Sequence, residues 1–135
     1  AAKAAFKASN EAISNDGRFP LTPQRILKDV KEVIPEDAII FTDVGWNKNG
    51  VAQEFDITVP GTIHHSSGLA TMGFGPSAVL GGKLAAPDKI VLTRTGDGGF
   101  GVNPFSPAGV LPLPGVLLAN APLSQEKFYR HYTFF

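Results

Sequence analysis

Cysteine is absent from this sequence, which excludes a disulfide framework and a zinc site built on cysteine. No apolar run is long enough to span a bilayer, and the first residues lack the apolar core of a secretory signal. Charge of one sign is not in excess either, because 12 basic residues balance 12 acidic ones. A chain without an excess of positive charge lacks the usual electrostatic signature of a polyanion binder. We therefore expect a cytoplasmic protein that binds neither nucleic acid nor a membrane.

Composition and length indicate one domain with flanking segments. With 43% apolar and 18% charged residues over 135 positions, the chain has the make-up of a single globular domain. We expect a linker helix over residues 1–19, the domain core over 20–105 and a divergent or aberrant tail over 106–135. Four prolines between residues 104 and 114 would break a helix there. The tail and the start at a residue other than Met indicate a fragment of a longer parent.

Short apolar runs alternate with amphipathic segments along the core. Residues 38–42 and 89–93 are continuously apolar or nearly so, which is typical of strands buried on both faces of a parallel sheet. Thr22 is a suitable cap for a helix that follows it. Helices are predicted over 23–34, 46–55 and 74–86. This alternation predicts an α/β fold, a three-layer sandwich around a mostly parallel sheet that is incomplete at its C-terminus.

Three glycine-containing segments are the candidate ligand sites. Residues 43–47 and 96–100 follow the two predicted strands, and ligands of α/β proteins bind at such strand ends. One carboxylate beside exposed backbone amides, as at Asp97, suits a phosphate bridged by Mg²⁺. The third segment, 68–75, contains the only Met of the chain. Each has an ordinary reading when taken alone: a turn at Asp97, a helix cap at Asp43 and core filling by Met.

Together, the order and spacing of the segments DVG, GLATMGFG and GDGG resemble the diphosphate-binding (PP) domain of thiamine-diphosphate enzymes. The acetolactate synthase group is the most similar, and the resemblance covers roughly residues 20–104. It implies the thiamine-diphosphate-binding fold, with thiamine diphosphate and Mg²⁺ as cofactors and Asp97 as the metal ligand. The cofactor-binding residues that it implies are Val44, Gly45, Trp46, Asn47, Ala70, Thr71, Met72, Gly96, Asp97, Gly98 and Gly99.

The resemblance also implies individual roles. Met72 matches the bulky apolar residue that holds the cofactor bent, and the Ala70 carbonyl and Met72 amide match groups that hydrogen-bond its pyrimidine ring. Orientation of this kind is worth several kcal/mol as preorganisation. The cofactor carries the carbon chemistry, so the parent is expected to be a lyase or transferase acting on a 2-oxoacid, a decarboxylase or a carboligase.

Two departures from the family pattern limit what the chain is expected to do alone. The family places a metal-binding Asn further along the chain than Asn120, which is kept as a weak second metal ligand. The catalytic glutamate of the family lies on the pyrimidine-binding domain of a partner subunit, so no catalytic residue is assigned here. We expect a homo-oligomeric parent, with FAD possible only in that full-length protein, and a chain that is inactive alone.

Other interpretations stay open. Residues 73–78 match the pattern G-x-G-x-x-A of dinucleotide-binding domains, although such a fingerprint should directly follow a strand. The chain is alternatively a non-catalytic fragment or a remnant that depends on a partner. His64 and His65 are expected to have solvent or packing roles rather than catalytic ones. Trp46 is expected to pack at a subunit interface, with a substrate contact from Trp46 and Asn49 as the alternative.

Overall fold

The computed structural model describes residues 2–102 and 116–121, the latter as backbone. Most of the expected tail over 106–135 lies outside the described residues, as does the proline-rich segment. The described elements are α1 (Ala2–Ser14), α2 (Pro23–Val33), β1 (Ile39–Thr42), α3 (Trp46–Glu54), β2 (Ile63–His65), α4 (Phe74–Ala85), β3 (Val91–Gly96), α5 (Asp97–Gly101) and β4 (Val116–Ala121). None of these helices has the length and apolar character that would let it cross a membrane.

The described strands form one sheet in the order β2-β1-β3-β4. All neighbouring pairs are parallel, with Ile40 opposite both Ile63 and Leu92, and Thr95 opposite Asn120. Parallel neighbours require crossover connections, and α3 and α4 lie in these connections. The prediction of an α/β fold with a parallel sheet is therefore confirmed.

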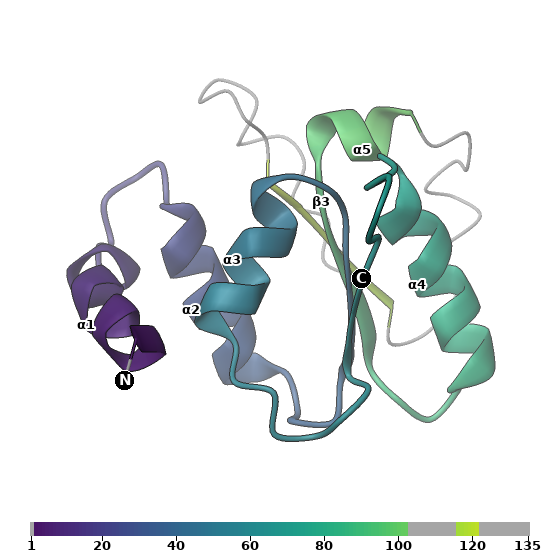
Figure 1. Cartoon of the computed structure of the whole chain (residues 1–135), viewed down its shortest axis with the longest axis horizontal. Coiled ribbons are helices and arrows are strands. Elements are labelled where there is room, and N and C mark those ends of the chain that lie inside the picture. Colours follow the sequence, from purple (N-terminus) through teal and green to yellow (C-terminus); the bar gives the residue numbers. More distant parts are fainter. Residues whose placement is uncertain (1, 103–115, 122–135) are drawn as a thin grey trace.

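Helices cover both faces of the sheet (Figure 1). Side chains of a strand alternate between faces, and β1 follows this rule. Ile40 packs in a cluster with Leu27 of α2 and Val51 of α3, whereas Ile39 and Phe41 pack in a second cluster with Val79 of α4. The three-layer arrangement that the sequence predicts is present, and the sheet forms the middle layer.

Glycine lets α4 approach the sheet closely at one of two adjacent positions. A Cβ atom added to Gly82 would lie 2.4 Å from the ring of Phe41, so the helix backbone rests directly on that ring. A Cβ atom added to Gly81 would meet nothing within 4 Å. The close contact between this helix and the sheet therefore exists at Gly82.

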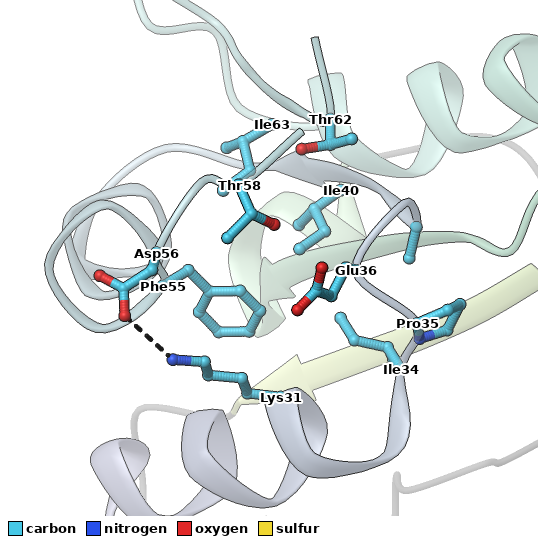
Figure 2. A pocket seen from close by; sticks show the side chains of 11 residues that line it. Lys31, Ile34, Pro35, Glu36, Ile40, Phe55, Asp56, Thr58, Thr62 and Ile63 are labelled. Atoms are coloured by element: carbon cyan, nitrogen blue, oxygen red, sulfur yellow. Dashed lines mark hydrogen bonds and ion pairs between the residues drawn. The ribbon is translucent and has the colours of Figure 1, made fainter. Parts of the chain in front are cut away.

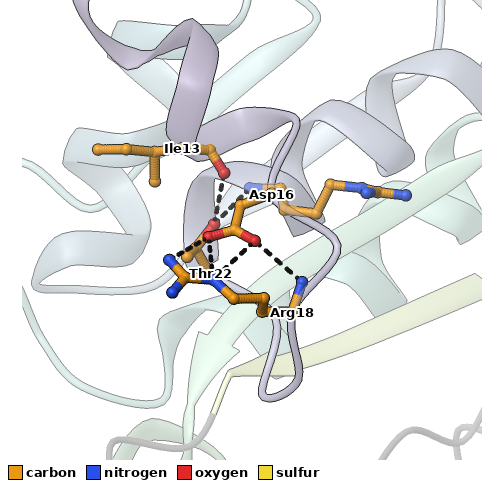
Figure 3. A network of polar contacts seen from close by, with 5 residues as sticks. Ile13, Asp16, Arg18 and Thr22 are labelled. Carbon is orange, nitrogen blue, oxygen red and sulfur yellow. Dashed lines mark hydrogen bonds and ion pairs between the residues drawn. The ribbon is translucent and has the colours of Figure 1, made fainter.

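Polar contacts, rather than apolar burial, hold α1 in place. This helix has no buried residue. Figure 3 shows its C-terminal connection, in which the Thr22 hydroxyl donates to the Ile13 carbonyl at 3.1 Å and the guanidinium of Arg18 bonds the carboxylate of Asp16. At its other end the amines of Lys3 and Lys7 pair with Asp56.

Strand β3 is longer than its apolar run, and the segment after it is helical. The sequence predicts a strand over 89–93 and a loop at Asp97, whereas the strand runs over Val91–Gly96 and Asp97 begins the short helix α5. The added strand residues Arg94 and Thr95 are polar but buried, at 3% and 0% exposure. Their side chains have partners inside the fold, so the strand continues beyond the point where hydropathy indicates its end.

Candidate functional site

The three candidate segments lie at one edge of the sheet. Because β1, β2 and β3 are parallel, their carboxyl ends meet there, and the chain leaves these ends into residues 43–45, into 66–73 and into α5. Figure 1 shows the starts of α3 and α5 at this upper edge. The fold therefore brings together segments that are separated by about 50 residues of sequence, as the family resemblance requires.

Two helices begin at this edge with glycine caps. Gly45 precedes α3 with φ 85° and Gly73 precedes α4 with φ 82°, and neither helix receives a side-chain cap. The first amides of a helix have no partner within the helix, and together with the helix dipole they favour an anion. The first turn of α3, which contains Trp46 and Asn47, thus offers N–H groups to a ligand at the sheet edge. The Val44 amide is engaged instead, because it donates to the carboxylate of Asp43 at 2.7 Å.

The loop before α4 has an unusual backbone. Gly68, Ala70 and Gly73 all have positive φ, and Ala70 is the non-glycine residue among them at φ 47°. A left-handed alanine is strained, and such strain is commonly found at ligand sites. Two apolar side chains of this loop face solvent, since Leu69 is 96% exposed and Met72 is 49% exposed. The loop therefore presents an apolar surface instead of burying it.

The glycines around Asp97 contact both other loops. A Cβ atom added to Gly96 would lie 3.3 Å from Nδ2 of Asn47, and one added to Gly98 would lie 2.8 Å from Cε of Met72. Gly96 thus adjoins the 43–47 segment, and Gly98 adjoins the loop over residues 66–73, which we call the Met loop. The side chain of Asp97 itself lies outside the described part of the structure.

Asp43 connects its own segment to the start of α4 and to the end of β3, a role that sequence reasoning missed. Its carboxylate is buried at 1% exposure and accepts from the Gly73 amide at 3.0 Å and from the Thr95 hydroxyl at 2.9 Å. The sequence favours a helix cap at this position, yet α3 has Gly45 as its N-cap and no side-chain cap bond. The available signal was a carboxylate directly after a buried strand, which does not identify partners far away in sequence.

Trp46 packs on a buried cation. The guanidinium of Arg94 lies 4.8 Å from the centroid of the Trp46 ring, within the range of a cation–π contact. Gly50 permits the arrangement, because an added Cβ atom there would lie 2.5 Å from the Trp46 ring and 2.9 Å from the Arg94 guanidinium. Trp46 keeps 39% of its surface exposed at the sheet edge. The surroundings of the Trp46 ring therefore depend on the state of this edge of the sheet.

The possible metal ligands are few. In the part of the chain that the structure describes, no three His, Asp or Glu side chains gather as a ready metal cluster. Asp97 begins α5 at the end of β3, and Asn120 of β4 lies opposite Thr95, two residues before Asp97. Their backbones thus share an edge, while both side chains lie outside the described residues. His64 stacks on Phe41 with ring centroids 5.1 Å apart, which is a packing contact.

A separate cavity lies away from these loops. It has a volume of about 300 Å³ and is lined by residues before and at the start of β1 and β2, among them Glu36, Ile40 and Ile63. Figure 2 shows Phe55 beside it and the ion pair of Lys31 with Asp56 at its rim. The carboxyl ends of the strands lie at the other edge of the sheet. The cavity therefore contributes nothing to the site at the three loops.

The residues of the site match a family of cofactor-binding domains. Residues 43–108 match the family described as thiamine pyrophosphate enzyme, C-terminal TPP binding domain. The match begins at Asp43 and includes all three loops. The pattern G-x-G-x-x-A at residues 73–78 does not directly follow a strand, because the loop from residue 66 separates it from β2.

Three proteins with sequences similar to this chain are named acetolactate synthases. The chain is 39% identical over 103 residues to a probable acetolactate synthase large subunit of Methanococcus aeolicus, covering 73% of the chain and 17% of that protein. It is 44% identical over 90 residues to one from Methanocaldococcus jannaschii, covering 62% and 15%. The chloroplastic acetolactate synthase of Arabidopsis thaliana is 34% identical over 134 residues, covering 93% and 19%. The chain thus spans less than a fifth of the length of these relatives.

Proposed function

We propose that this chain, which belongs to the family of C-terminal TPP-binding domains of thiamine pyrophosphate enzymes, holds thiamine diphosphate and Mg²⁺ for an acetolactate synthase-like enzyme that acts on a 2-oxoacid. The single observation that carries the proposal is the meeting of three loops at one sheet edge, with Gly96 and Gly98 against Asn47 and Met72. The family match over residues 43–108 supports the same cofactor.

The residues present fit the diphosphate of this cofactor. A diphosphate needs several N–H donors and room for its oxygens beside the backbone. The glycine cap of α3 leaves the first-turn amides without a side-chain partner, and a Cβ atom added to Gly45 would meet nothing within 4 Å. We assign diphosphate contacts to Gly45, Trp46 and Asn47, and to Gly98 and Gly99 at the other loop. Val44 adjoins these contacts through its side chain, since its amide already donates to Asp43.

Asp97 is our proposed ligand for Mg²⁺. Mg²⁺ takes few protein carboxylates and shares phosphate oxygens of the ligand, so a single aspartate is sufficient. Asp97 follows β3 directly and is flanked by Gly96 and Gly98. Asn120 is the second, weaker candidate, because β4 ends beside β3 at the same edge.

The Met loop orients the rest of the cofactor. When bound, thiamine diphosphate supplies the electron sink for cleaving or forming bonds at the 2-oxoacid carbonyl carbon. Met72, half-exposed over Gly98, is the apolar wedge against which a bent cofactor would rest. Thr71 continues this surface, and the strained backbone at Ala70 presents its carbonyl to the pyrimidine ring. An apolar wedge and a hydrogen-bond acceptor that are already in place reduce the entropy that the cofactor loses when it is oriented.

Fluorescence of Trp46 tests the proposal directly. It is the only Trp in the chain and lies at the start of α3, so its emission reports binding at the cradle. We expect thiamine diphosphate to change the emission only with Mg²⁺ present and to raise the melting temperature. NAD is the control ligand for the dinucleotide alternative. A response to NAD, or none to thiamine diphosphate with Mg²⁺ by either measurement, would refute the proposal.

The parent enzyme and its partners are part of the proposal. Several relatives are named large subunits, and a large subunit implies assembly with other subunits. We propose a cytoplasmic homo-oligomer in which the pyrimidine-binding domain of a partner subunit supplies the catalytic carboxylate, with FAD possible only there. The alternative is a non-catalytic, partner-dependent piece. Size-exclusion chromatography separates the two, because a partner-dependent piece stays unfolded or aggregated even with cofactor and Mg²⁺.

A further inference from the structure

One buried carboxylate receives hydrogen bonds from two loops of the proposed site and from the strand that leads into the third. Oδ1 of Asp43 accepts from the Val44 amide at 2.7 Å, and the Gly73 amide donates to Oδ1 and Oδ2 at 3.2 and 3.0 Å. The Thr95 hydroxyl donates to Oδ2 at 2.9 Å. These donors come from the loop after β1, from the start of α4 and from the end of β3.

The surroundings of Asp43 are shaped around its carboxylate. A Cβ atom added to Gly99 would lie 2.6 Å from Oδ2 of Asp43 and equally close to Oγ1 of Thr95, so α5 packs on this pair without space for a side chain. A Cβ atom added to Gly75 of α4 would lie 2.4 Å from Oγ1 of Thr93 and 3.4 Å from the backbone nitrogen of Asp43, so α4 also comes close to this position. Asp43 and Thr95 are 1% and 0% exposed. The carboxylate is therefore enclosed by helices α4 and α5 and by the ends of strands β1 and β3.

We propose that Asp43 is a positioning residue, which fixes the spacing of the three loops and thereby sets the affinity of the site for thiamine diphosphate with Mg²⁺. This inference rests on the proposed function, since it names a further determinant of the same site. Hydrogen bonds to a charged acceptor are strong, and buried donors without a partner are costly. Asp43 does not touch the cofactor. It acts through Gly73, Val44 and Thr95.

Replacement of Asp43 separates loop positioning from general stability. In Asp43→Ala the three donors lose the carboxylate that joins them, and we expect affinity for thiamine diphosphate at saturating Mg²⁺ to fall at least about tenfold. Asp43→Asn keeps one oxygen for the Val44 and Gly73 amides, so its affinity should lie between. Val79→Ala is the control, because it empties a buried position between α4 and the sheet without touching the loops. This variant should melt earlier yet retain affinity.

Hydrogen exchange provides a readout that needs no cofactor. We expect the Val44 and Gly73 amides to exchange at least about tenfold faster in Asp43→Ala than in the wild-type chain, and to remain protected in Val79→Ala. Unchanged exchange at both amides would overturn the positioning role alone. Failure of the wild-type chain to bind thiamine diphosphate would instead overturn the proposed function.

A milder variant decides the matter if Asp43→Ala does not fold. Thr95→Val keeps the shape of the side chain and removes only the donor from β3, while Thr95→Ser keeps the hydroxyl. We expect Thr95→Val to lose several-fold in affinity and Thr95→Ser to stay near the wild type. Wild-type affinity in Thr95→Val would contradict the proposal.

Discussion

The start of α2 and the starts of α3 and α4 are built in opposite ways. Helix α2 is capped by its own chain, since the Thr22 hydroxyl accepts from the Arg25 amide at 3.2 Å and Pro23 occupies the first turn. Helices α3 and α4 begin after Gly45 and Gly73, without a side-chain cap. All three belong to the same small domain, so the difference reflects position: α2 starts at the corner with α1, and the other two start at the sheet edge.

The contrast shows where the fold is closed by its own side chains and where it is left open to a ligand. At the α1–α2 corner Asp16 pairs with Arg18, and at the other end of α1 Asp56 pairs with three lysines. At the edge, glycines hold the helix starts and a strained Ala70 shapes the loop. A helix start capped by glycine forgoes roughly a few tenths of a kcal/mol relative to a side-chain cap. That loss is consistent with first-turn backbone amides that remain available to bind an anion.

Removal of Asp97 should have the largest effect at the open edge. We expect Asp97→Ala to abolish Mg²⁺-dependent binding of thiamine diphosphate, because the metal loses its proposed carboxylate ligand. Titration of Trp46 emission measures the loss. Asp88→Ala is the matched control, since Asp88 is exposed in the turn before β3, at the far end of that strand. Unchanged affinity in Asp97→Ala would count against the site.

Removal of the α2 cap should affect stability alone. Thr22→Ala deletes the bond to the Arg25 amide and the bond to the Ile13 carbonyl, and we expect a loss of about 1 kcal/mol in unfolding free energy. Urea denaturation measures it, with Thr22→Ser as the control that keeps the hydroxyl. Cofactor affinity should not change. A fall in affinity equal to that of an edge variant would erase the distinction between the two regions.

Local signals in the sequence were enough to predict the layers of the fold. The apolar run at 38–42 and the cap at Thr22 identify a strand and a helix start without long-range information. The sheet edge also followed, because parallel strands bring their carboxyl ends together. The joint order of the glycine loops then indicated the family.

The contacts between the loops could not be predicted in this way. Asp43 resembles a helix cap in sequence, but its partners Gly73 and Thr95 lie 30 and 52 residues away. Similarly, Arg94 and Thr95 look like the start of a loop because they are polar, yet both are buried in β3. Buried polar residues depend on partners that only the folded chain supplies.

Loss of the Asp56 charge should have a modest effect that depends on pH. Hydrogen bonds from Lys7, Lys31 and Lys3 hold the pKa of Asp56 well below its usual range. A lowered pKa stabilises the fold above the unfolded value of about 3.9, and the contribution is lost as pH falls below it. Because this carboxylate is half-exposed, Asp56→Asn should cost less than about 1 kcal/mol at pH 7.

Acid titration of unfolding checks the sign. The stability gap between the wild type and Asp56→Asn should narrow as pH falls below about 4, and it should also shrink in high salt. The cavity beside Asp56 (Figure 2) is far from the loops, so cofactor affinity should stay constant. A gap that widens in acid would contradict the ion-pair account.

The smallest effect is expected where the open edge stores backbone strain. Ala70 has φ 47°, a region that glycine adopts freely. Ala70→Gly relieves strain of about 1 kcal/mol in the folded state, but the added freedom of the unfolded chain offsets most of that gain. We therefore expect a change within about 0.5 kcal/mol in stability, measured by urea denaturation, and weaker cofactor binding because the loop is less fixed. Ala70→Val is the contrasting variant, since a β-branched residue tolerates this φ poorly. Tighter cofactor binding by Ala70→Gly would mean that the strain at Ala70 opposes binding. The loop before α4 would then be less preorganised for the cofactor than the helix starts at the same edge.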